Sequence, residues 1–153
     1  MFTFKATIYK EGMNYVVDVP DNSEDYFLKS GYIPVRGTIN SEDFKGTLIP
    51  RKKNKHVLFV NWAIRTRIDK SEFDTIEVSI EYDPESRELP VPEDVELILS
   101  EDSRIYEAFL RVSPSQRREI LKYVIDAKKA KTRLKRIQKI ADHFRERLLK
   151  KDK

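Results

Sequence analysis

The chain has 153 residues, of which 39% are hydrophobic and 37% charged, and its formal net charge is +4. It contains no cysteine, which excludes disulfides, zinc–thiolate sites and a cysteine nucleophile. No apolar run approaches the ~20 residues that span a bilayer, and the first residues alternate instead of forming a signal-peptide core, so we expect a cytoplasmic protein without a membrane span.

The first half of the chain is typical of short β-strands. Apolar and polar side chains alternate over residues 2–8 and again, most regularly, over residues 75–82. The other strands expected here cover residues 15–19, 35–39, 44–49 and 57–61, and a short helix is expected at residues 23–28, ended by Gly31. Six or so short strands at this spacing predict a small, closed or nearly closed β-barrel over residues 1–90.

Helical periodicity begins after the prolines of residues 89–92, which mark a linker. Ser113 is a good N-cap with Pro114 at the first helical position, and Thr132 could cap the last helix. A single helix over residues 114–149 is the alternative. The predicted fold class is therefore α+β, with an amino-terminal β-barrel followed by a carboxy-terminal helical domain of three or four helices at residues 93–153.

The charge is distributed unequally between these two parts. Residues 1–92 carry 13 Lys and Arg against 15 Asp and Glu, a net −2, whereas residues 103–153 carry 17 against 6, a net +11. A basic segment of this kind favours an anionic partner, although solvated lysine-rich helix faces have the same composition.

Two stretches resemble a known family. Residues 113–140 open with Ser-Pro-Ser and continue through Ala-Lys, Thr-Arg and Arg-Ile pairs, which resembles the carboxy-terminal domain of the YdeI/OmpD-associated, or bacteriocin-protection, family. Residues 35–40, followed by His56 and the strand at 76–82, resemble the small β-barrel domain of unknown function that often precedes it. The resemblance implies a role in bacterial tolerance of envelope stress and antimicrobial peptides.

No catalytic signature is present. The sequence lacks a Gly-x-Ser-x-Gly elbow, a phosphate-binding glycine loop and a His-Glu-x-x-His motif, and its two histidines, His56 and His143, lie in different segments. We therefore expect no cofactor and no metal site. The sequence favours a binding protein over an enzyme, and an enzyme acting on a small anionic ligand remains the open alternative.

Four arginines are the candidate ligand-binding residues. Arg36 lies on a predicted strand, where an inward guanidinium would need an acceptor, and Arg65 and Arg67 point the same way if their segment is extended. Arg133 stands at the start of the last helix, whose amino terminus favours negative charge. We predict that these four residues line an anion-accepting cleft where the barrel meets the helices. Pairing with strand carboxylates such as Glu81 is the alternative.

Residues 128–139 hold the densest basic cluster of the chain. No aromatic residue lies between Tyr123 and Phe144, so the cluster lacks the stacking side chains typical of nucleic-acid surfaces. Sequence-specific nucleic-acid binding is not expected, while a nucleic-acid module using the basic helices stays an alternative to a protein partner or a small anionic ligand.

Trp62 is predicted to pack in the core at the barrel mouth, with a stacking platform as the alternative. The sequence carries no signal for an oligomeric state.

Overall fold

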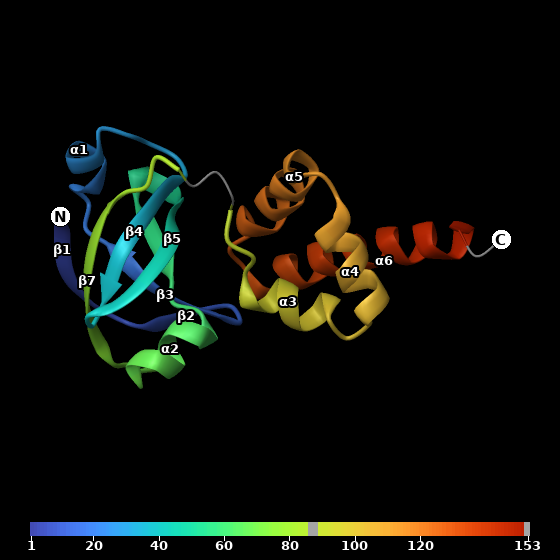
Figure 1. The fold of residues 1–153 in the computed structure, drawn as a ribbon, viewed down its shortest axis with the longest axis horizontal. Coiled ribbons are helices and arrows are strands. Elements are labelled where there is room, and N and C mark those ends of the chain that lie inside the picture. Colours follow the sequence, from blue (N-terminus) through green and yellow to red (C-terminus); the bar gives the residue numbers. More distant parts are fainter. Residues whose placement is uncertain (86–88, 152–153) are drawn as a thin grey trace. The chain divides into compact units, whose positions relative to one another are not determined.

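The chain divides into two units, one built around a β-sheet and one made of helices (Figure 1). The computed structural model describes residues 1–85 and 89–151, and the units are Met1–Pro90 and Val91–Lys153. This arrangement confirms the predicted α+β class.

A seven-stranded antiparallel sheet forms the first unit in the described part of the chain. Its strands are β1 (Phe2–Thr7), β2 (Tyr9–Glu11), β3 (Asn14–Val19), β4 (Ile33–Ile39), β5 (Glu42–Pro50), β6 (His56–Phe59) and β7 (Thr75–Tyr82). They lie in the order β1-β7-β4-β5-β6-β3-β2. The sheet curls into a half-barrel, so that β1 also comes close to β3. Three short helical segments complete the unit, namely α1 (Ser23–Phe27), η1 (Lys52–Asn54) and α2 (Trp62–Ile68).

The core of this unit follows directly from the period of two along its strands. In β7, Ile76, Val78 and Ile80 are buried while Glu77 is exposed. Their register partners on β1 include Phe4, opposite Val78, so the apolar faces of the two strands coincide. Each such buried side chain contributes roughly 1.5–3 kcal/mol of transfer free energy, which fixes the strand register.

Two local expectations for this unit are wrong. The sequence Lys10-Glu11-Gly12 predicts a turn, but Lys10 and Glu11 belong to β2, in which Glu11 pairs with Asn14. The chain turns one step later, at Gly12, whose φ is 65°. The helix α1 ends earlier than predicted, since Leu28 adopts the left-handed conformation at its carboxyl end, with φ 55°.

The second unit contains four helices in its described part, α3 (Glu93–Leu99), α4 (Ser103–Arg111), α5 (Pro114–Ile125) and α6 (Ala130–Lys151). Ser113 is the N-cap of α5 and accepts a 3.1 Å hydrogen bond from the Gln116 amide, as predicted. The alternative of one long helix is wrong, because α5 and α6 are separate. Thr132 does not cap α6, since the Arg133 amide already donates to the Lys129 carbonyl.

The helices share an apolar core of their own. Phe109 of α4 and Phe144 of α6 meet edge to face with ring centroids 6.4 Å apart, and both are buried. Val95 and Leu121 add contributions from α3 and α5. No helix in residues 1–85 or 89–151 is both long and apolar enough to cross a bilayer.

Gly37 provides a test of the sheet. A Cβ atom at this position would lie 2.0 Å from the Ser79 carbonyl oxygen of β7, the strand that pairs with β4. Because backbone cannot move aside as a flexible side chain can, we expect Gly37→Ala to lower the free energy of unfolding by about 2–3 kcal/mol. Urea unfolding measures this. Gly31→Asn is the control, since Gly31 has open space around it and Asn tolerates its φ of 70°. Equal stability of the two variants would show that β4 and β7 are not this close.

Candidate functional site

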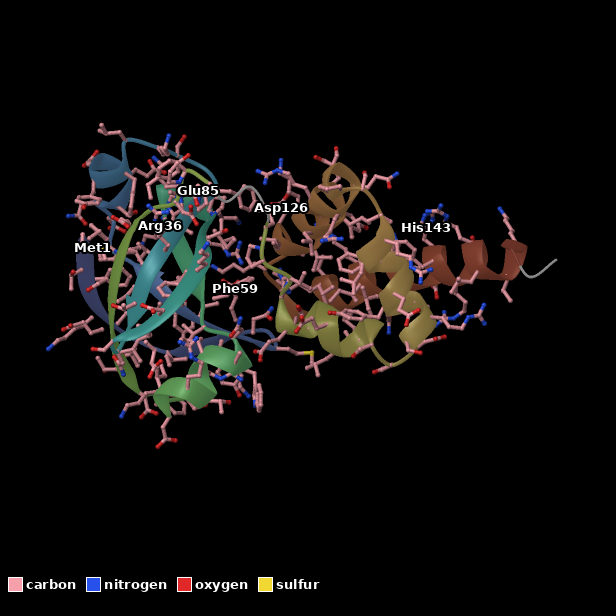
Figure 2. All side chains as sticks on the ribbon, viewed as in Figure 1. Met1, Arg36, Phe59, Glu85, Asp126 and His143 are labelled. Carbon is pink, nitrogen blue, oxygen red and sulfur yellow. The ribbon has the colours of Figure 1, made fainter. Side chains whose placement is uncertain are left out.

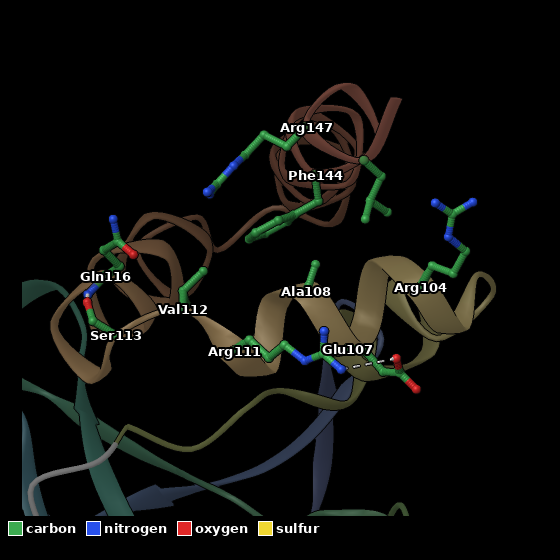
Figure 3. Close-up of a pocket in the computed structure, with 10 residues that line it drawn as sticks. Arg104, Glu107, Ala108, Arg111, Val112, Ser113, Gln116, Phe144 and Arg147 are labelled. Carbon is green, nitrogen blue, oxygen red and sulfur yellow. Dashed lines mark hydrogen bonds and ion pairs between the residues drawn. The ribbon is translucent and has the colours of Figure 1, made fainter. Parts of the chain in front are cut away.

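A hollow of about 380 Å³ lies within the helical unit, between α4, the start of α5 and the second half of α6 (Figure 3). It exists because the helices differ in length. The 22 residues of α6 extend about 33 Å, whereas the 9 residues of α4 extend about 14 Å. The distal part of α6 therefore runs past the other helices of the unit (Figure 1), and α4 is one of the helices that α6 contacts.

The floor of the hollow is apolar. Phe144 and Leu148 contribute from α6, and Ala108 and Val112 from the end of α4. Ile105 and Phe109 of α4 face the buried core, whereas Ala108 is only half-buried, because one helical position turns the side chain by about 100°. The small Ala108 side chain leaves the space that a larger residue would fill.

The rim of the hollow is positively charged. Arg104 and Arg111 stand on α4, Arg147 on α6, and Glu107 is the one acidic residue among those that line the hollow. The Arg111 and Glu107 side chains are 82% and 64% exposed, with 3.9 Å between the nearest nitrogen and oxygen, so their attraction neutralises little of this charge. In the described part of the chain, Arg147 makes no ion pair. The hollow is suited to a ligand that is both apolar and anionic.

The structure places the predicted ligand residue Arg36 on β4 (Figure 2), and Glu81 is its register partner on β7. Its Nε donates to Glu81 at 3.1 Å, and Asp83 lies 3.7 Å away. The hydrogen bond to Glu81 is the main cause that raises the pKa of Arg36 above its ordinary value. The guanidinium thus pairs with the neighbouring strand, which is the alternative given in the sequence analysis.

Arg65 and Arg67 lie on the helix α2, so the extended segment considered for them is wrong. Asn61 caps this helix by accepting from the Ile64 amide at 3.0 Å. Residues two apart on a helix are about 200° apart around its axis, and the two guanidinium groups accordingly have different partners. Arg65 donates to the Val60 carbonyl at 2.8 Å and lies 3.6 Å over the Tyr15 ring.

Arg67 donates to Glu42 at 3.1 Å and to the Asp43 carbonyl at 2.8 Å. Arg36, Arg65 and Arg67 therefore each have acceptors within the first unit. Trp62, at the start of α2, is 65% exposed, so the prediction that it packs in the core is wrong.

Arg133 is buried inside the helical unit, with its side chain 1% exposed and that of Asp94 4% exposed. Its Nε and Nη2 donate to the two Asp94 oxygens at 2.7 and 2.9 Å, and Nη1 donates to the Val124 and Ala127 carbonyls at 3.0 Å. One guanidinium thus joins α3, the end of α5 and the start of α6. The four arginines as a shared anion site stay a prediction.

The basic cluster of residues 128–139 divides between surface and interior. The exposed members are Lys128, Lys129, Lys131, Lys135 and Lys139. Arg136 donates to the Tyr123 carbonyl at 2.7 Å and lies 4.7 Å over the Tyr123 ring. The lysines form the solvated part of the cluster, and Arg136 helps to hold α6 against α5.

Comparison with known families identifies both units. Residues 88–147 match the family model described as "Bacteriocin-protection, YdeI or OmpD-Associated", and residues 4–80 match "Domain of unknown function (DUF1905)". The chain belongs to the DUF1905 family, whose model covers half of its length, and its helical part matches the YdeI/OmpD-associated family. The family resemblance predicted from the sequence is confirmed, with a DUF1905 domain preceding the family's helical domain. No curated protein matches the chain.

The hollow was not predicted, although it lies almost wholly within the matched bacteriocin-protection domain. Part of its signal is local, since Arg104, Ala108 and Arg111 recur at the spacing of one helix side. Arg147 follows 36 positions after Arg111, and only the packing of α6 on α4 brings the two to one hollow.

The buried guanidinium gives a direct test of the helical unit. Arg133→Ala leaves the Asp94 carboxylate buried without its partner, so we expect the free energy of unfolding to fall by about 3–5 kcal/mol. Chemical denaturation followed by helical circular dichroism measures the change.

Arg145→Ala is the matched control on the same helix. Its pair with Asp142, 2.7 Å away, is exposed, and its loss should cost about 0.5 kcal/mol or less. If both substitutions cost the same, Arg133 does not organise the three helices.

Proposed function

We propose that the chain is a cytosolic binding protein that contributes to bacterial tolerance of bacteriocins and envelope stress by holding an anionic partner in the hollow of its helical unit. The observation that carries the proposal is the rim of three arginines and one glutamate over an apolar floor. The match of residues 88–147 to the bacteriocin-protection family supplies the physiological setting.

The charge of the helical unit determines the kind of partner. From Ser103 onward the chain has 17 Lys and Arg against 6 Asp and Glu. A surface of this sign attracts anions and repels cations, and the effect on association falls as salt screens it. Direct capture of a basic peptide toxin at this hollow is therefore disfavoured. The positive charge of the helical unit instead favours protection through an acidic or anionic partner inside the cell.

The side chains of the hollow favour binding over catalysis. Arginine guanidinium groups stay protonated in proteins and cannot act as general bases. The Ser113 hydroxyl already accepts the hydrogen bond that caps α5, and Glu107 is largely exposed to solvent. These groups can orient and neutralise an anion, which is what a binding site requires.

Non-specific nucleic-acid binding is the second candidate, and the five exposed lysines of residues 128–139 favour it. Binding through lysines alone weakens steeply as salt rises, because it depends on counterion release. A salt titration with a random oligonucleotide separates this candidate from binding in the hollow, whose apolar floor is insensitive to salt.

Survival of a bacteriocin-sensitive strain tests the proposal. Expression of the wild-type chain should raise survival under bacteriocin, and the double variant Arg111→Gln/Arg147→Gln should lose at least half of that gain, since it removes two of three rim charges. Lys139→Gln/Arg145→Gln is the control, because it lowers the net charge equally outside the hollow. It should protect as well as wild type.

Protein abundance in the cytosolic fraction is measured in every strain, so that loss of protection is not loss of protein. Absence of protection by the wild-type chain rejects the proposed role. Undiminished protection by the double variant rejects the hollow as its site.

A further inference from the structure

The hollow also indicates which class of anion it accepts, an inference that rests on the proposed function. We infer that it binds a single-chain amphiphile with one carboxylate, of which a medium-chain fatty acid is the simplest example. The carboxylate is placed beside Arg147 and Gln116, and the hydrocarbon chain lies on Phe144, Ala108 and Leu148.

The volume selects a small ligand. About 380 Å³ lies near the lower end of the range of roughly 300–1,000 Å³ found for small-molecule sites. An α-helix with its side chains is about 10–12 Å across, so an acidic helix could insert only one or two side chains here. A phospholipid would have to leave most of its two acyl chains in water.

The floor and the rim together require both parts of an amphiphile. Val112, Ala108 and Leu148, together with the buried Phe144 beneath them, give the hollow an apolar floor, which an inorganic anion would leave exposed to water. A neutral hydrocarbon would cover this surface but leave Arg147 without a counter-charge. A ligand with one apolar chain and one anionic group satisfies both.

The head group belongs at the α5 end of the hollow. Figure 3 shows Arg147 extending from α6 across the hollow toward the side on which Gln116 and Ser113 lie, while Arg111 runs along α4 toward Glu107. The guanidinium of Arg147 can hold a carboxylate through two parallel hydrogen bonds. The side-chain amide of Gln116 is a neutral donor beside it. The amino terminus of the 12-residue helix α5 adds a favourable field for an anion.

At the α5 end of the hollow, one guanidinium with neutral donors matches a single negative charge. The other two rim arginines are placed elsewhere, since Arg111 is next to Glu107 and Figure 3 shows Arg104 at the opposite end of the hollow from Ser113 and Gln116. A phosphate dianion at the α5 end would therefore have one negative charge without a partner. This balance favours a carboxylate over a phosphate monoester.

Calorimetric titration with decanoate below its micelle concentration tests the inference on the full chain. We expect saturable 1:1 binding, and affinities at least about ten-fold weaker for decanol, which lacks the charge, and for acetate, which lacks the chain. Equal binding of decanoate and decanol would overturn the head-group assignment, and equal binding of decanoate and acetate would overturn the apolar subsite. Binding only to vesicles of anionic phospholipid would assign the surface to a membrane instead and overturn the inference.

Two substitutions locate the site. Arg147→Gln keeps an exposed polar side chain and should weaken decanoate about ten-fold or more, the usual effect of losing a charged hydrogen bond, without changing decanol binding. Ala108→Trp fills the floor and should abolish the binding of both. Arg145→Gln, two residues from Arg147 but outside the lining, should bind like wild type. If Arg145→Gln and Arg147→Gln weaken decanoate equally, the anion is not held in the hollow.

The outcomes separate this inference from the proposed function. Loss of bacterial protection in the Arg111→Gln/Arg147→Gln variant, combined with no decanoate binding by wild type, would leave the hollow functional and reject the ligand class. Decanoate binding with unchanged protection would retain the ligand and reject the physiological role.

Discussion

The helical unit depends on one buried guanidinium. Arg133 cannot lose its proton, so its charged side chain can be buried only because a carboxylate and two backbone carbonyls accept its hydrogen bonds. Asp94 supplies both carboxylate oxygens from α3, and the carbonyls of Val124 and Ala127 come from the end of α5. Carbonyls at the end of a helix lack intrahelical donors, so Arg133 also completes the hydrogen bonding where α5 stops. The first turns of α6 are thereby fixed against two other helices by one side chain, and the direction in which the rest of α6 runs is set there.

The hollow is a consequence of how α6 continues from that anchor. The distal half of α6 meets α4 through the edge-to-face contact of Phe144 with Phe109, and the start of α5 lies at the same hollow. A 9-residue helix cannot cover the distal turns of a 22-residue helix. The side chains next to Phe144, among them Arg147, therefore remain at the surface while the apolar floor beneath them is kept in place. An apolar floor with a few polar groups at its edge is the lining typical of small-molecule sites.

Local patterns predicted much of this structure, and long-range contacts explain most of the errors. The alternation in residues 75–82 and the Ser113 cap are signals within a few residues, and both were predicted correctly. Residues 62–68 form a helix that Asn61 caps. This cap is a short-range signal, and the prediction of an extended segment at residues 65–67 did not use it. The burial of Arg133 could not be predicted, since its partner Asp94 lies 39 positions earlier and a basic residue at a helix start is ordinarily solvated. The hollow depends in the same way on the packing of α6 against α4.

Two arginines of α6 show how surroundings determine the part that a side chain plays. Arg133 and Arg147 are 14 positions apart, which brings them to nearly the same side of the helix, about 40° apart, and separates them by about 21 Å along its axis. At the first position α3 and α5 close over the guanidinium, which donates to the Asp94 carboxylate and to two backbone carbonyls. At the second position the same charge stands at the rim of the hollow between α4, the start of α5 and α6, and no protein carboxylate is paired with it in the described chain. A guanidinium held at the edge of an apolar floor is weakly hydrated and geometrically matched to a carboxylate. The covering helices thus make one arginine structural and leave the other available to a ligand.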